Sequence, residues 1–324
     1  MAIMKRLTIL LALLLSTTML SAQTFEREVD IKCDWGELSA TLAMGETGSD
    51  TAIVIVAGSG PTDRNGNSSL NLNTYCYKLL SDALVEDGYA VVRYDKRAIG
   101  QSVIPMEDIP NLLFDDYVDD VEVVVNYLRS EGFRRVVIAG HSEGGLIALV
   151  AASSGVKVDG LVLLAAPGYP MDQILRTQLR AQLMPQHMAL MLQADVILRS
   201  LKAGKPYPDE KIAKELLSLF HSSVQPFLIN TMQYDPQQLA KGIEKPMLVV
   251  CGGNDIQVSP DNGEVIVKAA PNAQLVVFEN MTHVMKDWAS EDRLEQVVNV
   301  YVNSQLPLTE GLTSAISQFI ANIK

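Results

Sequence analysis

Short apolar runs recur along the chain and alternate with stretches of helical character. Apolar runs of four to eight residues bounded by Gly, Pro, Asn or Asp are typical of buried strands. Helices are predicted near residues 74–86, near 117–130 and directly after 142. The alternation predicts an α/β fold whose mostly parallel sheet is covered by helices on both faces. The predicted strands are residues 51–57, 90–94, 136–139, 161–165, 247–251 and 274–278.

An N-terminal antiparallel hairpin is predicted around residues 34–37, and the regular pattern then breaks at Gly168 and resumes only at Met247. The interval is helical in character and rich in methionine, which predicts a helical cap inserted after the sixth strand. The expected organisation is a core of residues 23–167 and 246–324 with a cap of 168–245. Flexible methionines suit a malleable substrate pocket, and they equally suit packing of cap helix on cap helix. They are Met171, Met184, Met188, Met191 and Met232.

Two helical stretches are expected to close the chain. Residues 287–303 suggest a closing helix, and residues 308–320 form a second amphipathic stretch. The second stretch is expected to pack either on the core or on a partner, because its apolar face must be covered.

Composition and charge narrow the class of protein. The 324 residues are 48% hydrophobic and 20% charged, which is ordinary for a globular enzyme built as one large domain or a domain with an insertion. The net charge of −12 argues against nucleic acid as a partner.

The first residues have the pattern of a signal peptide. Lys5 and Arg6 precede an apolar run at residues 7–15 that is too short to span a bilayer, and cleavage is expected after Ala22. Residues 1–22 are therefore expected to direct export to the periplasm or the cell exterior, with no membrane anchor left after cleavage. The alternative is an uncleaved N-terminal anchor.

The pentapeptide of residues 140–144, Gly-His-Ser-Glu-Gly, directly follows a predicted strand and opens a predicted helix. A G-x-S-x-G sequence in this context is typical of a nucleophile elbow, in which a tight turn exposes the serine Oγ. Glycines are needed two positions before and after Ser142, because side chains there would clash. The alternative is a glycine-rich turn without chemistry.

A serine hydroxyl needs a base and an orienting acid before it can act as a nucleophile. His283 follows a predicted strand end and is the candidate base; His141 is inside the elbow, and His187 and His221 fall in the helical insertion. Asp255 follows the end of the preceding strand, at the sheet edge where α/β proteins place functional groups. Asp255 is the candidate acid in the expected order Ser, Asp, His, with Asp261 as its nearest rival.

A loop of small residues after the first core strand is the candidate oxyanion loop. Residues 58–66 read Gly-Ser-Gly-Pro-Thr-Asp-Arg-Asn-Gly, and small residues let the backbone approach a substrate closely. The N–H groups of Ser59 and Glu143 are assigned as the oxyanion donors. The alternative is a plain turn held in shape by pairing of Asp63 with Arg64.

Together these motifs resemble the α/β-hydrolase superfamily, specifically bacterial esterase/lipase-like members with a Gly-Ser-Gly-Pro-x-Asp-Arg oxyanion loop. Residues 93–102, Arg-Tyr-Asp-Lys-Arg-Ala-Ile-Gly-Gln-Ser, also resemble a family loop, with Ala98 in place of the usual first glycine. The resemblance implies the α/β-hydrolase fold, the triad Ser142, Asp255 and His283, and carboxylic esters as substrates.

The expected function is hydrolysis of small acyl esters, with short acyl chains, through an acyl-enzyme on Ser142. One alternative is a serine aminopeptidase or acyl-peptide hydrolase, which would need a cap carboxylate to bind a peptide terminus. Another is a non-catalytic binding protein on the same scaffold. No cofactor and no metal are expected, because three cysteines and four scattered histidines form no ligand spacing. The candidate cap carboxylates are Asp172, Glu210 and Glu215.

Overall fold

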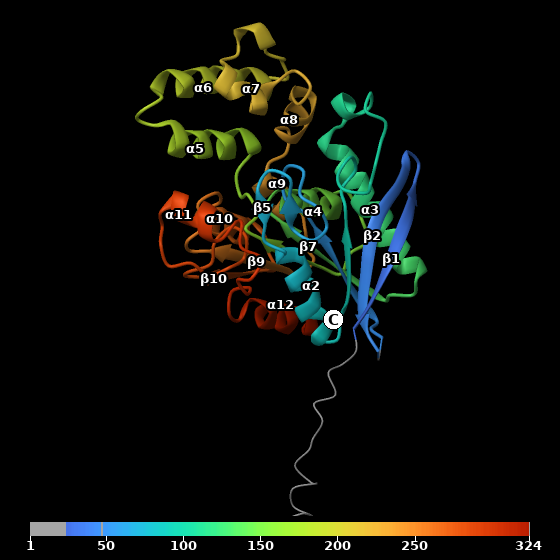
Figure 1. Cartoon of the computed structure of the whole chain (residues 1–324). Coiled ribbons are helices and arrows are strands. Elements are labelled where there is room, and N and C mark those ends of the chain that lie inside the picture. Colours follow the sequence, from blue (N-terminus) through green and yellow to red (C-terminus); the bar gives the residue numbers. More distant parts are fainter. Residues whose placement is uncertain (1–23, 47, 324) are drawn as a thin grey trace, which may run out of the picture.

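The computed structural model describes residues 24–46 and 48–323 (Figure 1), so the predicted signal peptide of residues 1–22 lies outside the described residues. Eight strands form one sheet in the order β1-β2-β6-β3-β7-β8-β9-β10. β2 runs antiparallel to β1 and β6, and every pairing from β6 to β10 is parallel. The predicted α/β-hydrolase fold is confirmed. The strands are β1 (Thr24–Cys33), β2 (Gly36–Gly45), β3 (Thr51–Val56), β6 (Ala90–Tyr94), β7 (Arg135–His141), β8 (Gly160–Leu164), β9 (Met247–Gly252) and β10 (Ala273–Phe278).

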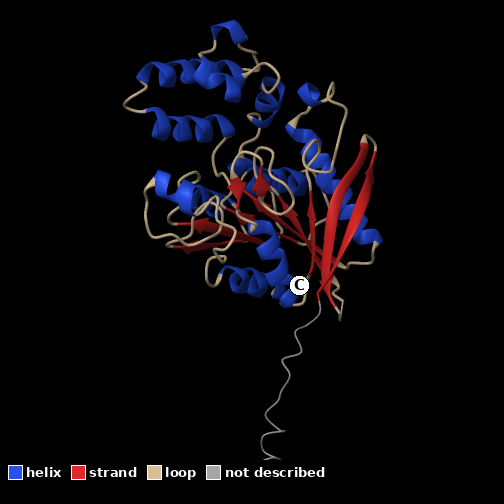
Figure 2. Ribbon diagram, viewed as in Figure 1, coloured by secondary structure: helices blue, strands red, loops and turns tan. Residues whose placement is uncertain are grey.

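Helices cover both faces of the sheet (Figure 2). Successive strand residues point to opposite faces, so Val54 of β3 packs on one side while Ile53 and Ile55 pack on the other. Full burial of one such side chain contributes about 1.5–3 kcal/mol to stability. One face is covered by α3 (Phe114–Ser130), α4 (Glu143–Ser153), α9 (Pro236–Lys241) and α10 (Asp261–Ala269), and the other by α2 (Cys76–Glu86) and α12 (Leu312–Ala321).

The predicted N-terminal hairpin is confirmed. β1 and β2 pair antiparallel over their full length, with Cys33 opposite Gly36 at the turn. A smaller hairpin of β4 (Asn67–Ser68) and β5 (Leu72–Asn73) lies in the loop after β3.

A separate layer of four helices lies beyond the end of the sheet, between β8 and β9 in the sequence (Figure 1). These helices bury a hydrophobic cluster of their own. Asp115 of α3 fastens the layer to the core: it bonds Asn230 (2.9 Å) and the Tyr234 hydroxyl (2.5 Å). The layer, called the cap below, consists of α5 (Met171–Leu183), α6 (Met188–Lys202), α7 (Lys214–Phe220) and α8 (Gln225–Thr231), with short 3-10 helices at Ile109–Asn111 and Asp209–Lys211 nearby.

The prediction of a long closing helix at residues 287–303 is wrong. The helix is only α11 (Arg293–Asn299), because the preceding residues form a loop in which Met281 bridges Asp287. The Asp292 side chain accepts from the Glu295 N–H (2.9 Å) and caps the start of the helix.

α12 packs on the core. Packing on the core was one of the two expectations for residues 308–320, and packing on a partner was the other. None of the helices in the described part of the chain is long and apolar enough to cross a membrane.

Candidate active site

Ser142 lies at a sharp turn between β7 and α4. Its backbone has φ 53° and ψ −122°, a conformation that L-residues rarely adopt. Such a conformation costs on the order of 1–3 kcal/mol and persists only where the surrounding structure enforces it. Here the Ser142 N–H donates to the Leu164 carbonyl (2.8 Å), which anchors the turn to the neighbouring strand. The predicted strand–turn–helix context of the elbow is present.

The glycines around Ser142 are needed for the reason predicted. A Cβ at Gly140 would lie 2.2 Å from the Gly144 carbonyl oxygen, and one at Gly144 would lie 2.2 Å from the Val56 carbonyl oxygen. Both neighbours are backbone atoms that cannot rotate away, so β3, β7 and α4 can approach this closely only with glycine.

Replacing Gly144 with alanine is therefore expected to lower the stability by about 3 kcal/mol, the upper end of the usual cost of overpacking, or roughly 4–5 °C in Tm for a chain of this length. Thermal unfolding followed by circular dichroism measures the shift. Gly242→Ala is the matched control, because its nearest contact is 3.6 Å away and its Tm should change little. An unchanged Tm for Gly144→Ala would contradict this packing argument.

Asp255 and His283 lie in hydrogen-bond contact. Asp255 Oδ2 is 2.8 Å from His283 Nδ1, and the Asp255 side chain is fully buried. The other carboxylate oxygen, Oδ1, accepts from the N–H groups of Gln257 (2.7 Å) and Val258 (2.9 Å). The carboxylate is thus held by its own turn, and its free oxygen fixes the orientation of the imidazole ring.

The loops that carry these two residues pack side by side, as expected. The Gly253 N–H donates to the Phe278 carbonyl (2.8 Å), and a Cβ at Gly252 would lie 2.1 Å from the Met281 oxygen. The rival acid Asp261 is exposed at the start of α10 and bonds Ser259. His187 and His221 are exposed in the cap, away from this pair.

A cavity of about 730 Å³ opens between the cap and the end of the sheet, and both Ser142 and His283 line it. Ser142 Oγ makes no hydrogen bond to any described residue, so it is free to meet the histidine or a substrate. The wall contributed by the cap is largely apolar; it includes Met171, Ile174, Leu175, Leu219, Phe227 and Leu228.

Two residues that line this cavity, Ser59 and Glu143, have backbone N–H groups without a partner. Among the described residues, neither Ser59 N–H nor Glu143 N–H donates to a protein acceptor. Glu143 is the first residue of α4, where the helix leaves its N–H groups unpaired and favours negative charge. Gly58 packs against the candidate nucleophile, since a Cβ there would lie 3.1 Å from Ser142 Cβ. The predicted oxyanion loop therefore lies beside the elbow.

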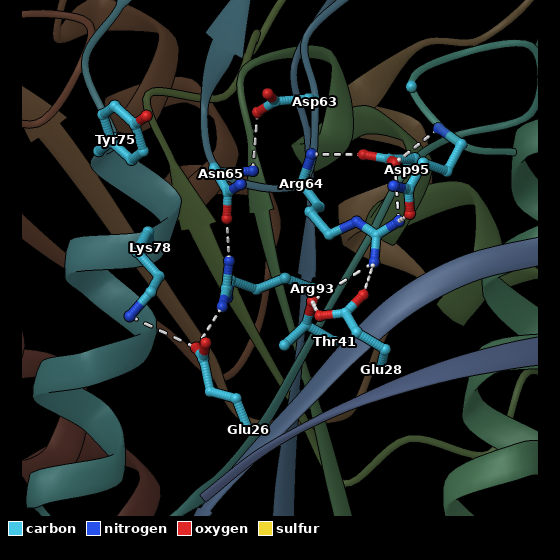
Figure 3. Close-up of a pocket in the computed structure, with 12 residues that line it drawn as sticks. Glu26, Glu28, Thr41, Asp63, Arg64, Asn65, Tyr75, Lys78, Arg93 and Asp95 are labelled. Atoms are coloured by element: carbon cyan, nitrogen blue, oxygen red, sulfur yellow. Dashed lines mark hydrogen bonds and ion pairs between the residues drawn. The ribbon is translucent and has the colours of Figure 1, made fainter. Parts of the chain in front are cut away.

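The pairing of Asp63 with Arg64, which belonged to the alternative interpretation of this loop as a plain turn, is not present. Asp63 Oδ1 instead accepts from the N–H groups of Asn65 (2.8 Å) and Asn67 (2.9 Å), which closes its own turn. Arg64 turns the other way and binds Asp95 (2.9 Å) and Glu28 (2.7 Å) (Figure 3). The N–H groups of the turn occupy the Asp63 carboxylate, so Arg64 finds its carboxylate partners on β1 and directly after β6.

These ion pairs line a second recess of about 450 Å³ (Figure 3). Arg93 of β6 extends the network by binding Glu26 of β1 (2.6 Å). Asp95 also accepts from the Arg64 N–H (2.7 Å), so it holds the candidate oxyanion loop directly. Both buried arginines pair with carboxylates, and the network fastens the candidate oxyanion loop and the β1–β2 hairpin to β6.

The loop after β6 encloses the Asp95 carboxylate. Gly100 has φ 54°, and a Cβ there would lie 2.4 Å from Asp95 Oδ2, which requires glycine. Ala98 has φ 68°, in the left-handed region that favours glycine. This explains why a glycine is usual at that position in the resembling loops.

His141 is buried, and its ring connects the loop that carries His283 with the loop that carries Gly58. Its Nε2 is 2.7 Å from the His283 carbonyl oxygen, and its Nδ1 is 2.8 Å from the Tyr77 hydroxyl. A carbonyl only accepts, so Nε2 carries the proton and Nδ1 accepts from Tyr77. The Tyr77 oxygen in turn accepts from the Gly58 N–H (3.0 Å). Burial lowers the pKa of His141 to about 3, so the ring is neutral.

This shift predicts acid sensitivity. A histidine whose pKa falls from 6.5 to about 3 on folding binds fewer protons in the native state across that window, so stability decreases as the pH falls below 6.5. The loss between pH 7 and pH 5 is expected to be about 2 kcal/mol. Urea unfolding at both pH values measures it. His141→Gln keeps a donor and an acceptor without titrating, and a slope equal to that of the wild type would contradict the assignment.

The cap carboxylates proposed for peptide binding are not at the cavity. Asp172 is buried but lies near Arg176 (3.7 Å) and Lys202 (3.4 Å), and Glu210 and Glu215 are exposed. The acid among the described cavity residues is Glu143, which pairs with Lys96 (3.2 Å).

Both interpretations of the cap methionines hold, for different residues. Met171 lines the cavity, whereas Met191 and Met232 pack in the core of the cap. Met188 is exposed. Among the described residues, no group of three or more His, Cys, Asp and Glu side chains could hold a metal ion.

Sequence reasoning missed Lys96 and Tyr77. Both line the cavity and bond the candidate oxyanion loop: Lys96 donates to the Gly58 carbonyl (2.6 Å), and the Tyr77 oxygen accepts from the Gly58 N–H. A lysine directly after a buried strand, within Asp95-Lys96-Arg97, was the available signal, because a charged side chain there has to find a partner at the sheet edge.

Several known proteins are similar to this chain in sequence or in fold. Esterase EstD of Thermotoga maritima is 28% identical over 268 residues, which cover 81% of this chain and 61% of that protein. The esterase Pf2001 of Pyrococcus furiosus has a similar structure (TM-score 0.58, 19% identity, 93% and 91% of the two chains). So do Est1E of Butyrivibrio proteoclasticus, solved with ferulic acid bound (0.57, 19%, 91% and 98%), and a proline iminopeptidase of Mycobacterium smegmatis (0.60, 14%, 91% and 98%).

The solved structures share the fold of this chain. The sequence model of the serine aminopeptidase S33 family matches residues 72–286, a span that includes Ser142, Asp255 and His283. A match over more than half of the chain defines its family. The chain therefore belongs to the serine aminopeptidase S33 family of the α/β-hydrolase superfamily.

Proposed function

We propose that this protein hydrolyses carboxylic esters through the triad Ser142, His283 and Asp255. The observation that carries the proposal is the convergence on one apolar cavity of the strained serine, the buried Asp255–His283 pair and two unpaired N–H groups. A nucleophile, an oriented base and oxyanion donors are the parts that acyl transfer requires.

The proposed reaction has two halves. His283 Nε2 takes the proton from Ser142 Oγ as Oγ attacks the ester carbonyl, and the N–H groups of Ser59 and Glu143 bind the oxyanion. Asp255 keeps the proton on Nδ1 and stabilises the imidazolium. Nε2 then protonates the leaving alcohol, and water attacks the acyl-enzyme with the same histidine as base.

The esterase interpretation is favoured over a serine aminopeptidase, despite the name of the family. A free peptide terminus is cationic and needs a carboxylate in the pocket. Among the described cavity residues, that carboxylate would have to be Glu143, which already pairs with Lys96. The cap contributes mostly apolar side chains to the wall, which suits an acyl or aryl group.

The proposal is tested with a fluorophosphonate probe and with p-nitrophenyl acetate, butyrate and octanoate. Labelling together with ester turnover supports it, and turnover that falls from acetate to octanoate supports the short-chain preference. The cavity volume leaves room for more than acetyl, so the series decides the acyl length. Labelling with turnover only of amino-acyl anilides would favour the aminopeptidase. Absence of labelling would favour a non-catalytic binding protein.

We further propose that residues 1–22 direct this activity out of the cytoplasm.

A further inference from the structure

Lys96 is a buried cation beneath the proposed oxyanion hole. It follows β6, and its side chain is 2% exposed. The ammonium donates to the Gly58 carbonyl (2.6 Å) and to Glu143 Oε1 (3.2 Å), and it lies 4.8 Å from the centre of the Tyr117 ring. These three partners satisfy a charge that would otherwise be costly to bury.

The carbonyl bound by Lys96 belongs to the peptide that carries the Ser59 N–H. A charge-assisted hydrogen bond to a peptide oxygen polarises the whole peptide unit and makes its N–H a stronger donor. The preceding peptide is held as well, because the Gly58 N–H donates to the Tyr77 oxygen (3.0 Å). Buried side chains therefore bind both backbone polar groups of Gly58, which fixes the direction of the next N–H.

Glu143 connects the same cation to the second donor. Its carboxylate accepts from Lys96 Nζ and from Ser59 Oγ (3.2 Å), while its backbone N–H is the other proposed oxyanion donor. The two donors come from loops far apart in the sequence, and Lys96 bonds both of these loops.

We propose that Lys96 is a positioning residue that aligns and polarises the oxyanion hole through the Gly58–Ser59 peptide. This inference rests on the proposed serine-hydrolase function. The oxyanion exists only along the reaction path, so the contribution of Lys96 should appear in the transition state and hardly in substrate binding.

The test is Lys96→Met, which keeps an unbranched apolar stem and removes the ammonium. With p-nitrophenyl butyrate, kcat is expected to fall about 10–100-fold, less than the 10²–10³ typical of deleting a donor outright, with KM within about threefold of wild type. Affinity for a trifluoromethyl ketone, whose adduct carries the tetrahedral oxyanion, should fall by the same factor. A kcat within threefold of wild type would overturn the inference.

A second variant separates polarisation from charge neutralisation. Lys96→Met leaves the Glu143 carboxylate buried without its cation, and Lys96→Met/Glu143→Gln removes that unpaired charge. The double variant is expected to regain thermal stability while kcat stays low. Recovery of wild-type kcat would show that Lys96 only neutralises Glu143, and would overturn the proposal.

Arg97→Met is the matched control in the same loop. Arg97 pairs with Asp116 and Asp120 on α3 and is not among the described cavity residues. The Arg97→Met variant is expected to have a lower Tm and an unchanged kcat.

If Lys96→Met does not fold, Tyr77→Phe is the second test. This variant removes the acceptor of the Gly58 N–H, and a severalfold loss in kcat at constant KM is expected. No loss in kcat would count against the inference.

The rate of fluorophosphonate labelling separates this inference from the proposed function. The probe forms a tetrahedral adduct on the serine and needs the oxyanion hole even where no ester is turned over. A wild type that is labelled but hydrolyses no ester refutes the ester proposal, while slower labelling of Lys96→Met still supports the role of Lys96. Equal labelling rates would refute that role alone.

Discussion

Ser142→Ala is expected to abolish fluorophosphonate labelling and to lower kcat for p-nitrophenyl esters by about 10⁶-fold, because the hydroxyl is the proposed nucleophile and the rest of the triad acts only through it. The fold should survive. Ser142 Oγ makes no hydrogen bond to a described residue, and alanine can adopt the same backbone conformation at a similar cost.

The measurement combines probe labelling, steady-state kinetics and thermal unfolding of the same preparation. Ser154→Ala is the matched control: Ser154 caps the other end of α4, away from the cavity, and its variant should be labelled like the wild type. Undiminished labelling or turnover of a folded Ser142→Ala variant would exclude Ser142 as the nucleophile.

Asp255→Asn should lower kcat by about 10⁴-fold with little change in KM, because it forces the wrong tautomer on His283. Asp255 Oδ1 accepts from the N–H groups of Gln257 and Val258, so the amide oxygen must take that place. The amide NH₂ then faces His283 Nδ1, which can only accept. The proton moves to Nε2, and the ring can no longer take a proton from Ser142.

Asp261→Asn is the matched comparison. Asp261 carries the same charge, lies in the same loop region and was the rival acid in the sequence, yet it is exposed and bonds Ser259. Its variant should keep kcat within about threefold of wild type. The reverse pattern, with loss of activity only in the Asp261 variant, would exclude Asp255 as the orienting acid.

The elements that could be predicted best were those with a strong local signal. The six core strands were located to within two residues at every end, because apolar runs bounded by polar turns mark them, and five of the six are buried on both faces. The need for glycine at positions 140 and 144 was also predicted correctly. A Cβ at either position would clash with backbone atoms, and this clash follows from a tight turn that the local sequence itself specifies.

Predictions failed where a side chain chooses among distant partners. The alternative of an Asp63–Arg64 pair rested on adjacency in the sequence, but Arg64 binds Asp95 and Glu28, which the sheet brings beside it. The closing helix was overestimated for a related reason. The residues before Asp292 are committed to the loop that carries His283, and packing of that loop outweighs local helical preference.

The sequence by itself determined the order of strands and helices, the strained turn at Ser142 and the residue types available for acyl transfer, because each depends on local periodicity or on sterics within a few residues. Only the tertiary structure decided that the Asp255 carboxylate meets His283, that the cap carboxylates lie away from the cavity, and that Lys96 and Tyr77 hold Gly58. Those contacts join residues from 19 to 38 positions apart in the chain. Which side chains meet over such separations depends on how the strands stack and how the loops pack at one end of the sheet.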